Sequence, residues 1–154
     1  MENYEGMARN CYASLMKDYG LRFAAFDNDE FFLVGNRFAI YVFVDRRDRR
    51  SDAWYVLLNN EGDILTYTLM YIQKDRYEQK DYALYGDPNS VDERIKSDMV
   101  VNASGLRNRC QDILSGDTNW LTNYPGQGTH SRHIARFLAP YFQQQGYYVK
   151  STEE

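Results

Sequence analysis

The sequence predicts an α+β fold, in which an antiparallel four- to five-stranded meander sheet is packed by an N-terminal helix and C-terminal helices. Apolar residues repeat every three or four positions near both ends of the 154-residue chain, whereas short apolar segments fill the region between them. The short connections between those segments favour antiparallel neighbours. Since we find no long linker, we expect residues 1–154 to form a single domain.

The first expected element is an amphipathic helix over residues 2–19. Its apolar residues, among them Tyr4, Ala8 and Leu15, recur at spacings of three and four. Gly20 follows directly, and glycine readily adopts the left-handed conformation that ends many helices. We therefore expect this helix to end at Gly20.

The sheet is expected from the next fifty residues. The predicted strands are 21–26, 31–34, 37–44, 53–58 and 64–72. Gly35-Asn36 is typical of a two-residue hairpin turn, and Gly62 can supply positive φ to a second turn. Residues 45–52 hold four arginines and three aspartates, a net charge of +1. We expect a self-neutralising loop there, with a phosphate contact as the open alternative.

Helices are expected again in the last third of the chain. Ser90 and Glu93 match a capping box, which begins a helix. The remaining expected elements are a helix over 98–114, a helix over 131–138 and a short strand over 147–149. Gly116 is placed to end the first of these helices. Pro140 should stop or kink the second, because proline lacks the N–H that a helix interior needs.

Composition and charge exclude several classes of protein. The chain has 18 basic and 22 acidic residues, a net charge of −4, which argues against a nucleic-acid partner. No segment approaches the ~18 apolar residues of a membrane span, and the N-terminus lacks the pattern of a signal peptide. Cys11 and Cys110 occupy apolar positions of expected helices, so we expect buried reduced thiols in a cytoplasmic protein.

The motifs of common enzymes are absent from the sequence. It contains neither GxSxG, typical of serine hydrolases, nor the glycine-rich loops GxxxxGK[ST] and GxGxxG. His130 and His133 are three positions apart, but zinc sites need three or four ligands. We therefore expect a protein without enzymatic activity, cofactor or metal.

Tyrosine is the unusual component, with 14 residues against 8 phenylalanines. Most tyrosines fit an expected helix or sheet face. Tyr77, Tyr82 and Tyr85 instead lie in a polar segment with Asp87, where tyrosine beside acidic residues suits a protein interface. Local packing of this segment is the alternative interpretation. A second candidate for partner binding is the acidic turn of Asp27, Asp29 and Glu30.

The order of the expected elements and one short motif resemble a known class of proteins. The helix before residue 117 ends in Ile113-Leu114-Ser115-Gly116-Asp117. This pattern, with the N-terminal helix and meander, resembles small cytoplasmic immunity proteins of bacterial polymorphic and contact-dependent toxin systems. The resemblance spans about residues 2–117. It implies a non-enzymatic inhibitor that neutralises a cognate toxin by covering its active site.

Two other functions stay open at this point. The first is a small enzyme or ligand-binding domain with a pocket near Trp120, Tyr124, His130 and His133. The second is a phage-encoded or adaptor-type inhibitor. The immunity-protein and the phage-type inhibitor hypotheses both require a protein partner. The enzyme or ligand-binding hypothesis instead requires a closed pocket that contains both histidines.

Overall fold

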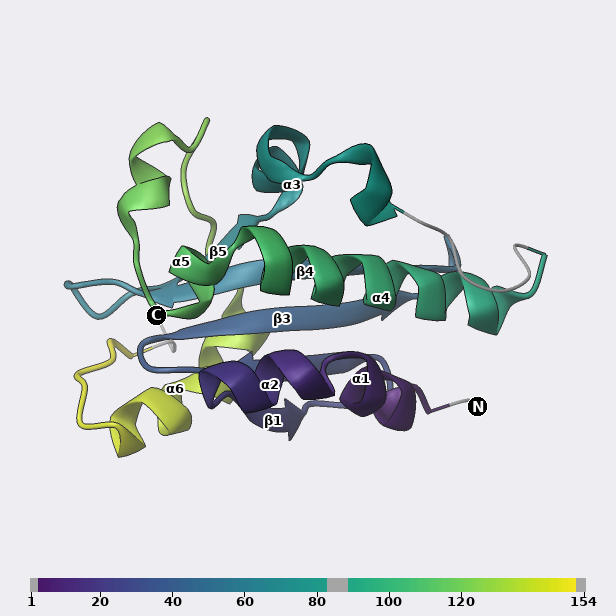
Figure 1. Ribbon diagram of the computed structural model, residues 1–154. Helices are drawn as coiled ribbons and strands as arrows, with labels where there is room; N and C mark the ends of the chain where they lie inside the picture. The colour runs from purple at the N-terminus through teal and green to yellow at the C-terminus, as the bar shows by residue number, and fades with distance from the viewer. Residues whose placement is uncertain (1–2, 83–88, 152–154) are drawn as a thin grey trace.

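The structure is a computed structural model in which residues 3–82 and 89–151 are described. These residues form a five-stranded antiparallel sheet in the order β1-β2-β3-β4-β5 (Figure 1). The strands are β1 (Arg22–Ala25), β2 (Glu30–Val34), β3 (Phe38–Asp45), β4 (Arg50–Leu58) and β5 (Ile64–Thr68). The predicted α+β meander is confirmed.

Helices cover both faces of the sheet, and they pack against different residues of its strands. The helices and short 3₁₀ turns are α1 (Glu5–Cys11), α2 (Ala13–Tyr19), α3 (Met70–Arg76), η1 (Gln79–Tyr82), α4 (Val91–Arg109), α5 (Gln111–Leu114), η2 (Asn119–Asn123) and α6 (Arg132–Gln144). One core joins α1, α2, α4 and α5 to Phe31, Ile40 and Tyr55, whereas α6 packs against Phe32 and Val56. Figure 1 shows α6 behind the sheet, and α1, α2 and α4 in front of it.

The central position of β3 explains why both of its faces are apolar. β3 pairs with β2 on one side, where Tyr41 faces Phe32, and with β4 on the other, where Tyr41 faces Trp54. Alternate side chains of a strand point to opposite faces, so each core receives every second residue. Ile40 and Val42 therefore enter one core, and Ala39 and Tyr41 enter the other.

The N-terminal helix is interrupted, which corrects the single helix predicted over 2–19. Tyr12 separates α1 from α2 with φ −101° and ψ 5°, and its side chain is fully buried. The interruption is a single residue, since the Tyr12 amide still donates to the Ala8 carbonyl at 3.0 Å and the Met16 amide to the Tyr12 carbonyl at 3.0 Å. Gly20 ends α2 in the left-handed conformation, as predicted.

The strand predicted over 64–72 was wrong in its last part. β5 ends at Thr68, whose hydroxyl accepts a hydrogen bond from the Met70 amide at 3.2 Å, and α3 follows. Leu69 is buried at this corner. The side-chain hydrogen bond and the buried leucine turn the chain away from the sheet, although the apolar pattern continues to Ile72.

The charged loop is shorter than predicted, because β3 extends to Asp45 and β4 begins at Arg50. The Asp98 carboxylate of α4 accepts hydrogen bonds from the Arg50 guanidinium, at 2.7 Å for each oxygen, and from the Ser51 amide at 2.9 Å. These contacts hold the start of β4 against α4. The boundary between the charged loop and β4 could not be predicted from the sequence, because it depends on where Asp98 lies in the folded chain.

The helix predicted over 98–114 begins earlier, at Val91, and is interrupted at Cys110, so that α4 ends at Arg109 and α5 follows. α4 starts at the predicted cap, where the Ser90 hydroxyl accepts from the Glu93 amide at 3.3 Å, and it continues to Arg109. α6 runs through Pro140 to Gln144, so, of the predicted stop or kink at Pro140, the stop was wrong. Pro140 and Arg136, whose carbonyl loses its helical donor, are both exposed, and water can satisfy this carbonyl. Residues 147–149 form no strand.

Replacing Asp98 by alanine is expected to lower the free energy of unfolding by about 2 kcal/mol, because the buried Ser51 amide would lose its acceptor. The Arg50 side chain is 59% exposed, so the ion pair itself contributes little. Urea denaturation measures this change. The control is Asp18→Ala, which removes an exposed ion pair with Arg107 and should cost less than about 1 kcal/mol. Equal losses in the two variants would contradict the prediction.

Candidate functional site

The structure separates the tyrosines of the predicted interface segment. Tyr77 is only 8% exposed and packs against Gly105 of α4, so the expectation that it lacks a core was wrong. Burial raises the pKa of its hydroxyl above the ordinary value. Tyr82 is 46% exposed and donates a hydrogen bond to the Gln73 carbonyl at 3.3 Å. Tyr85 and Asp87 lie outside the described residues.

The carboxylates of the acidic turn each have partners within the protein. Asp27 accepts hydrogen bonds from the amides of Asp29 and Glu30 at 2.9 and 2.8 Å. Both Asp29 oxygens accept from the Arg46 guanidinium at 2.7 Å. Glu30 accepts from the Tyr41 hydroxyl, and burial together with this carboxylate raises the pKa of Tyr41. The turn therefore organises the β1–β2 connection, and partner binding by its carboxylates stays a prediction.

Of the residues of the predicted aromatic and histidine pocket, Trp120 and Tyr124 lie side by side with 6.0 Å between their ring centroids, whereas His133 lies elsewhere, against Glu30. Trp120 is buried, with its ring 5.0 Å from that of Tyr55. Tyr124 and His130 line a shallow pocket of about 440 Å³. The Nε2 atom of His133 lies 2.9 Å from the Glu30 carboxylate at the start of α6.

Large hydrophobic side chains are exposed around α3. Met70 is 56% exposed and Tyr71 is 39% exposed. The Tyr71 ring contacts that of Tyr124 edge-on, with 5.5 Å between their centroids. The sequence pattern did not indicate Met70 and Tyr71 as site residues, because a strand continued to Ile72 would have placed them in the sheet. The signal that could have found them is Thr68, which can begin a helix.

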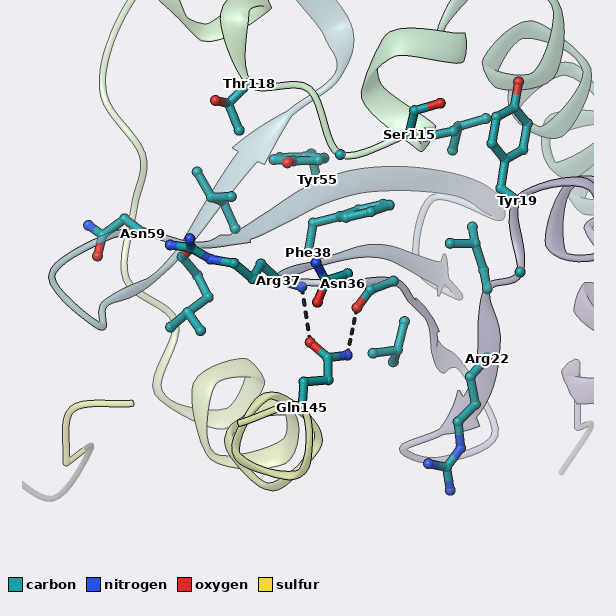
Figure 2. A pocket seen from close by; sticks show the side chains of 18 of the residues that line it. Tyr19, Arg22, Asn36, Arg37, Phe38, Tyr55, Asn59, Ser115, Thr118 and Gln145 are labelled. Atoms are coloured by element: carbon teal, nitrogen blue, oxygen red, sulfur yellow. Dashed lines mark hydrogen bonds between the residues drawn. The ribbon is translucent and has the colours of Figure 1, made fainter. Parts of the chain in front are cut away.

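A cleft of about 920 Å³ lies at one end of the sheet (Figure 2). The β2–β3 turn, the β4–β5 turn and the ends of α2 and α5 form its walls, and Gln145 borders it after α6. Leu114, Ser115 and Gly116 from the motif that resembles immunity proteins also line it. Gly116 has φ 89°, which redirects the chain from α5 into this wall.

Arg37 lies at the entrance of the cleft in an unusual backbone conformation. Its φ is 66°, a left-handed value that only a few per cent of residues other than glycine adopt. The Arg37 amide donates to the Gln145 side-chain oxygen at 3.0 Å, and the Gln145 side-chain nitrogen donates to the Gly35 carbonyl at 2.8 Å (Figure 2). These two hydrogen bonds from Gln145, the residue that follows α6, form a clamp that holds the β2–β3 turn.

The guanidinium of Arg37 is held in place without a carboxylate. Nη2 donates to the Leu58 carbonyl at 3.3 Å and to the Asn60 side-chain oxygen at 2.8 Å. The guanidinium carbon lies 5.1 Å from the centroid of the Tyr147 ring, a cation–π distance. Its Nε and Nη1 donors make no hydrogen bond to the described residues.

Tyr55 lines the cleft from β4, between Thr118 and Phe38 in Figure 2. Its ring stacks on that of Phe38 with 5.8 Å between centroids. The side chain is fully buried, and its hydroxyl has no hydrogen-bond partner among residues 3–82 and 89–151. Burial raises the pKa of this hydroxyl, so it is protonated at neutral pH.

The other reactive groups give no catalytic arrangement that we can name. Burial raises the pKa of the Cys110 thiol to about 11, so this thiol is protonated at neutral pH. Cys11 is only half-buried, which corrects the prediction of a buried side chain. Within the described part of the chain, no three His, Cys, Asp or Glu side chains are grouped as metal ligands. No helix in this part is both long and apolar enough for a membrane span.

Comparison of the chain with protein-family models, with curated proteins and with solved structures gives no match.

Proposed function

We propose that this protein is a non-enzymatic inhibitor that binds a protein partner and covers its active site, as cytoplasmic immunity proteins do. The observation that carries the proposal is the concentration of exposed aromatic and methionine side chains around α3. Of five large hydrophobic side chains exposed among the described residues, Met70, Tyr71 and Tyr82 lie on α3 and η1. We call these three residues, with Tyr124, the α3 surface.

The chemistry of the α3 surface supports a role in recognition. Tyrosine and methionine are enriched in the buried centres of protein interfaces, and tyrosine contributes a large contact area at low entropic cost. Next to this surface, the Arg109 guanidinium donates to Glu78 at 2.7 Å and to Asp81 at 3.0 Å. Apolar residues bordered by paired charges resemble the core and rim of an interface.

The test is binding to the product of the adjacent gene, which an immunity protein is expected to neutralise. Tyr71→Ala and Tyr82→Ala should each weaken binding by about tenfold, because central tyrosines of an interface are frequently hot spots. Isothermal titration calorimetry measures the affinity, and residual toxin activity measures the inhibition.

Tyr148→Ala is the matched control, since Tyr148 is 72% exposed and lies in the C-terminal segment, outside the α3 surface. It should leave the affinity unchanged. Absence of binding at micromolar concentration would contradict the proposed function. Binding that is insensitive to both α3 variants would contradict the assignment of the surface.

A further inference from the structure

We infer that the cleft beside Arg37 and Tyr55 is a binding site for a carboxylate, carried by an acidic peptide segment or by a small organic acid. The inference is independent of the α3 surface. It depends on the Arg37 guanidinium, which has no carboxylate partner among the described residues, and on the buried Tyr55 hydroxyl, which has no hydrogen-bond partner among them. Both groups line the same cleft.

The first observation is that Arg37 is prepared to bind an anion. Left-handed backbone at a residue other than glycine costs free energy, and such strain persists where surrounding structure enforces it, frequently at binding sites. Gln145 provides this enforcement. Because Nη2 is already occupied, Nε and Nη1 remain as donors, and a guanidinium matches the geometry of a carboxylate.

The second observation is the hydroxyl of Tyr55. A buried polar group without a hydrogen bond costs about 1–3 kcal/mol, so such groups require an explanation. Tyr55 lies in the wall of the cleft, and a ligand oxygen or a bridging water that reaches its hydroxyl would supply the missing acceptor. Tyr12 also has a buried hydroxyl without a described partner, but it does not line the cleft. Tyr12 is therefore a control for Tyr55, because it shares the buried hydroxyl but not the position in the cleft.

The charges around the cleft favour a single negative charge over a doubly charged phosphate. Arg37 has no carboxylate partner in the described chain, and Asp18 is already paired with Arg107 at 2.8 Å. Arg22, at the other end of the cleft, directs its guanidinium toward the Tyr141 ring, 5.2 Å away. Asp117 lies close enough to Tyr55 to raise the pKa of its hydroxyl further. This nearby acid would repel a dianion about twice as strongly as a singly charged carboxylate.

The experiment is an NMR titration of the ¹⁵N-labelled full chain. The probes are an acetylated and amidated Gly-Gly-Glu-Gly-Gly peptide, the same peptide with glutamine, sodium acetate and inorganic phosphate. We expect the Arg37 Nε–H and the Thr118 amide signals to shift saturably with the glutamate peptide and with acetate. The glutamine peptide should shift neither, and phosphate should bind more weakly than the glutamate peptide.

Two pairs of variants separate recognition from folding. Arg37→Gly should weaken binding of the glutamate peptide by about tenfold or more, whereas Arg49→Gly should not. Arg49 is a matched control, because it also has positive φ, 57°, but lies in the turn at the opposite end of β3. Glycine suits this backbone at both positions, so both variants should fold.

The second pair compares the two buried hydroxyls. Tyr55→Phe should weaken binding by about fivefold, and Tyr12→Phe should leave it unchanged, while neither should lower the melting temperature. Equal binding of the glutamate and glutamine peptides, tighter binding of phosphate, or full affinity in Arg37→Gly would each overturn the inference. Absence of any saturable shift at millimolar peptide would overturn it as well.

Discussion

Replacing Phe142 by alanine is expected to lower the free energy of unfolding by about 4 kcal/mol, among the largest effects of any single truncation in this chain. Phe142 is fully buried in the core between α6 and the sheet, together with Ile134 and Leu138. Loss of the ring removes its favourable transfer from water and leaves a cavity. α6 is the helix that packs on this face, so little else can fill that cavity.

Urea denaturation followed by circular dichroism measures the change. Gln143→Ala is the control, because the neighbouring side chain is exposed, and it should alter stability by less than about 0.5 kcal/mol. A loss below about 1 kcal/mol for Phe142→Ala would mean that α6 does not form part of a cooperative core. It would also show that the helix beyond Pro140 does not stabilise the fold.

Replacing Gly105 by alanine is expected to cost about 3 kcal/mol, through overpacking of a buried contact. An added Cβ would lie 2.0 Å from the Tyr77 ring, and Tyr77 is only 8% exposed, so the ring cannot move freely aside. The usual gain in helix propensity of alanine over glycine, about 1 kcal/mol, is too small to offset this clash.

Gly6→Ala tests this explanation directly. Gly6 lies in α1, and an added Cβ would meet no atom within 4 Å, so the same substitution should stabilise the protein slightly. The second test combines Gly105→Ala with Tyr77→Ala, since removal of the ring removes the clash. Strictly additive losses in the double variant would show that the Gly105–Tyr77 contact does not limit stability.

Local signals in the sequence were sufficient for most of the fold. The left-handed Gly20, the cap at Ser90 and the apolar segment 38–44 each depend on a residue and its near neighbours, and the structure confirms all three. The passage of α6 through Pro140 depends on packing against distant residues, and the end of β5 depends on a local hydrogen bond that the apolar pattern does not show. The pattern 64–72 was consistent with a strand, but the hydroxyl of Thr68 turns the chain after five strand residues.

The residues of the candidate sites could be predicted from the sequence less well than the fold. Tyr82 could be selected from its polar neighbours, but the same criterion selected Tyr77, whose partner Gly105 is 28 positions away in the chain. Nothing local distinguishes Arg37 from the arginines of the β3–β4 turn, because its clamp comes from Gln145. The missing partner of Tyr55 is equally invisible, since it is a property of the completed core.

The sequence by itself therefore determined the fold class, the order of the strands, and the acidic and tyrosine-rich character of the chain. These properties follow from periodicity, turn residues and composition, which act over a few positions. Tertiary structure decided which tyrosines are buried, where α3 exposes Met70 and Tyr71, and how Arg37 and Tyr55 come to share one cleft. The physical reason is that burial and hydrogen-bond satisfaction depend on segments that meet only after the sheet and its helices have packed.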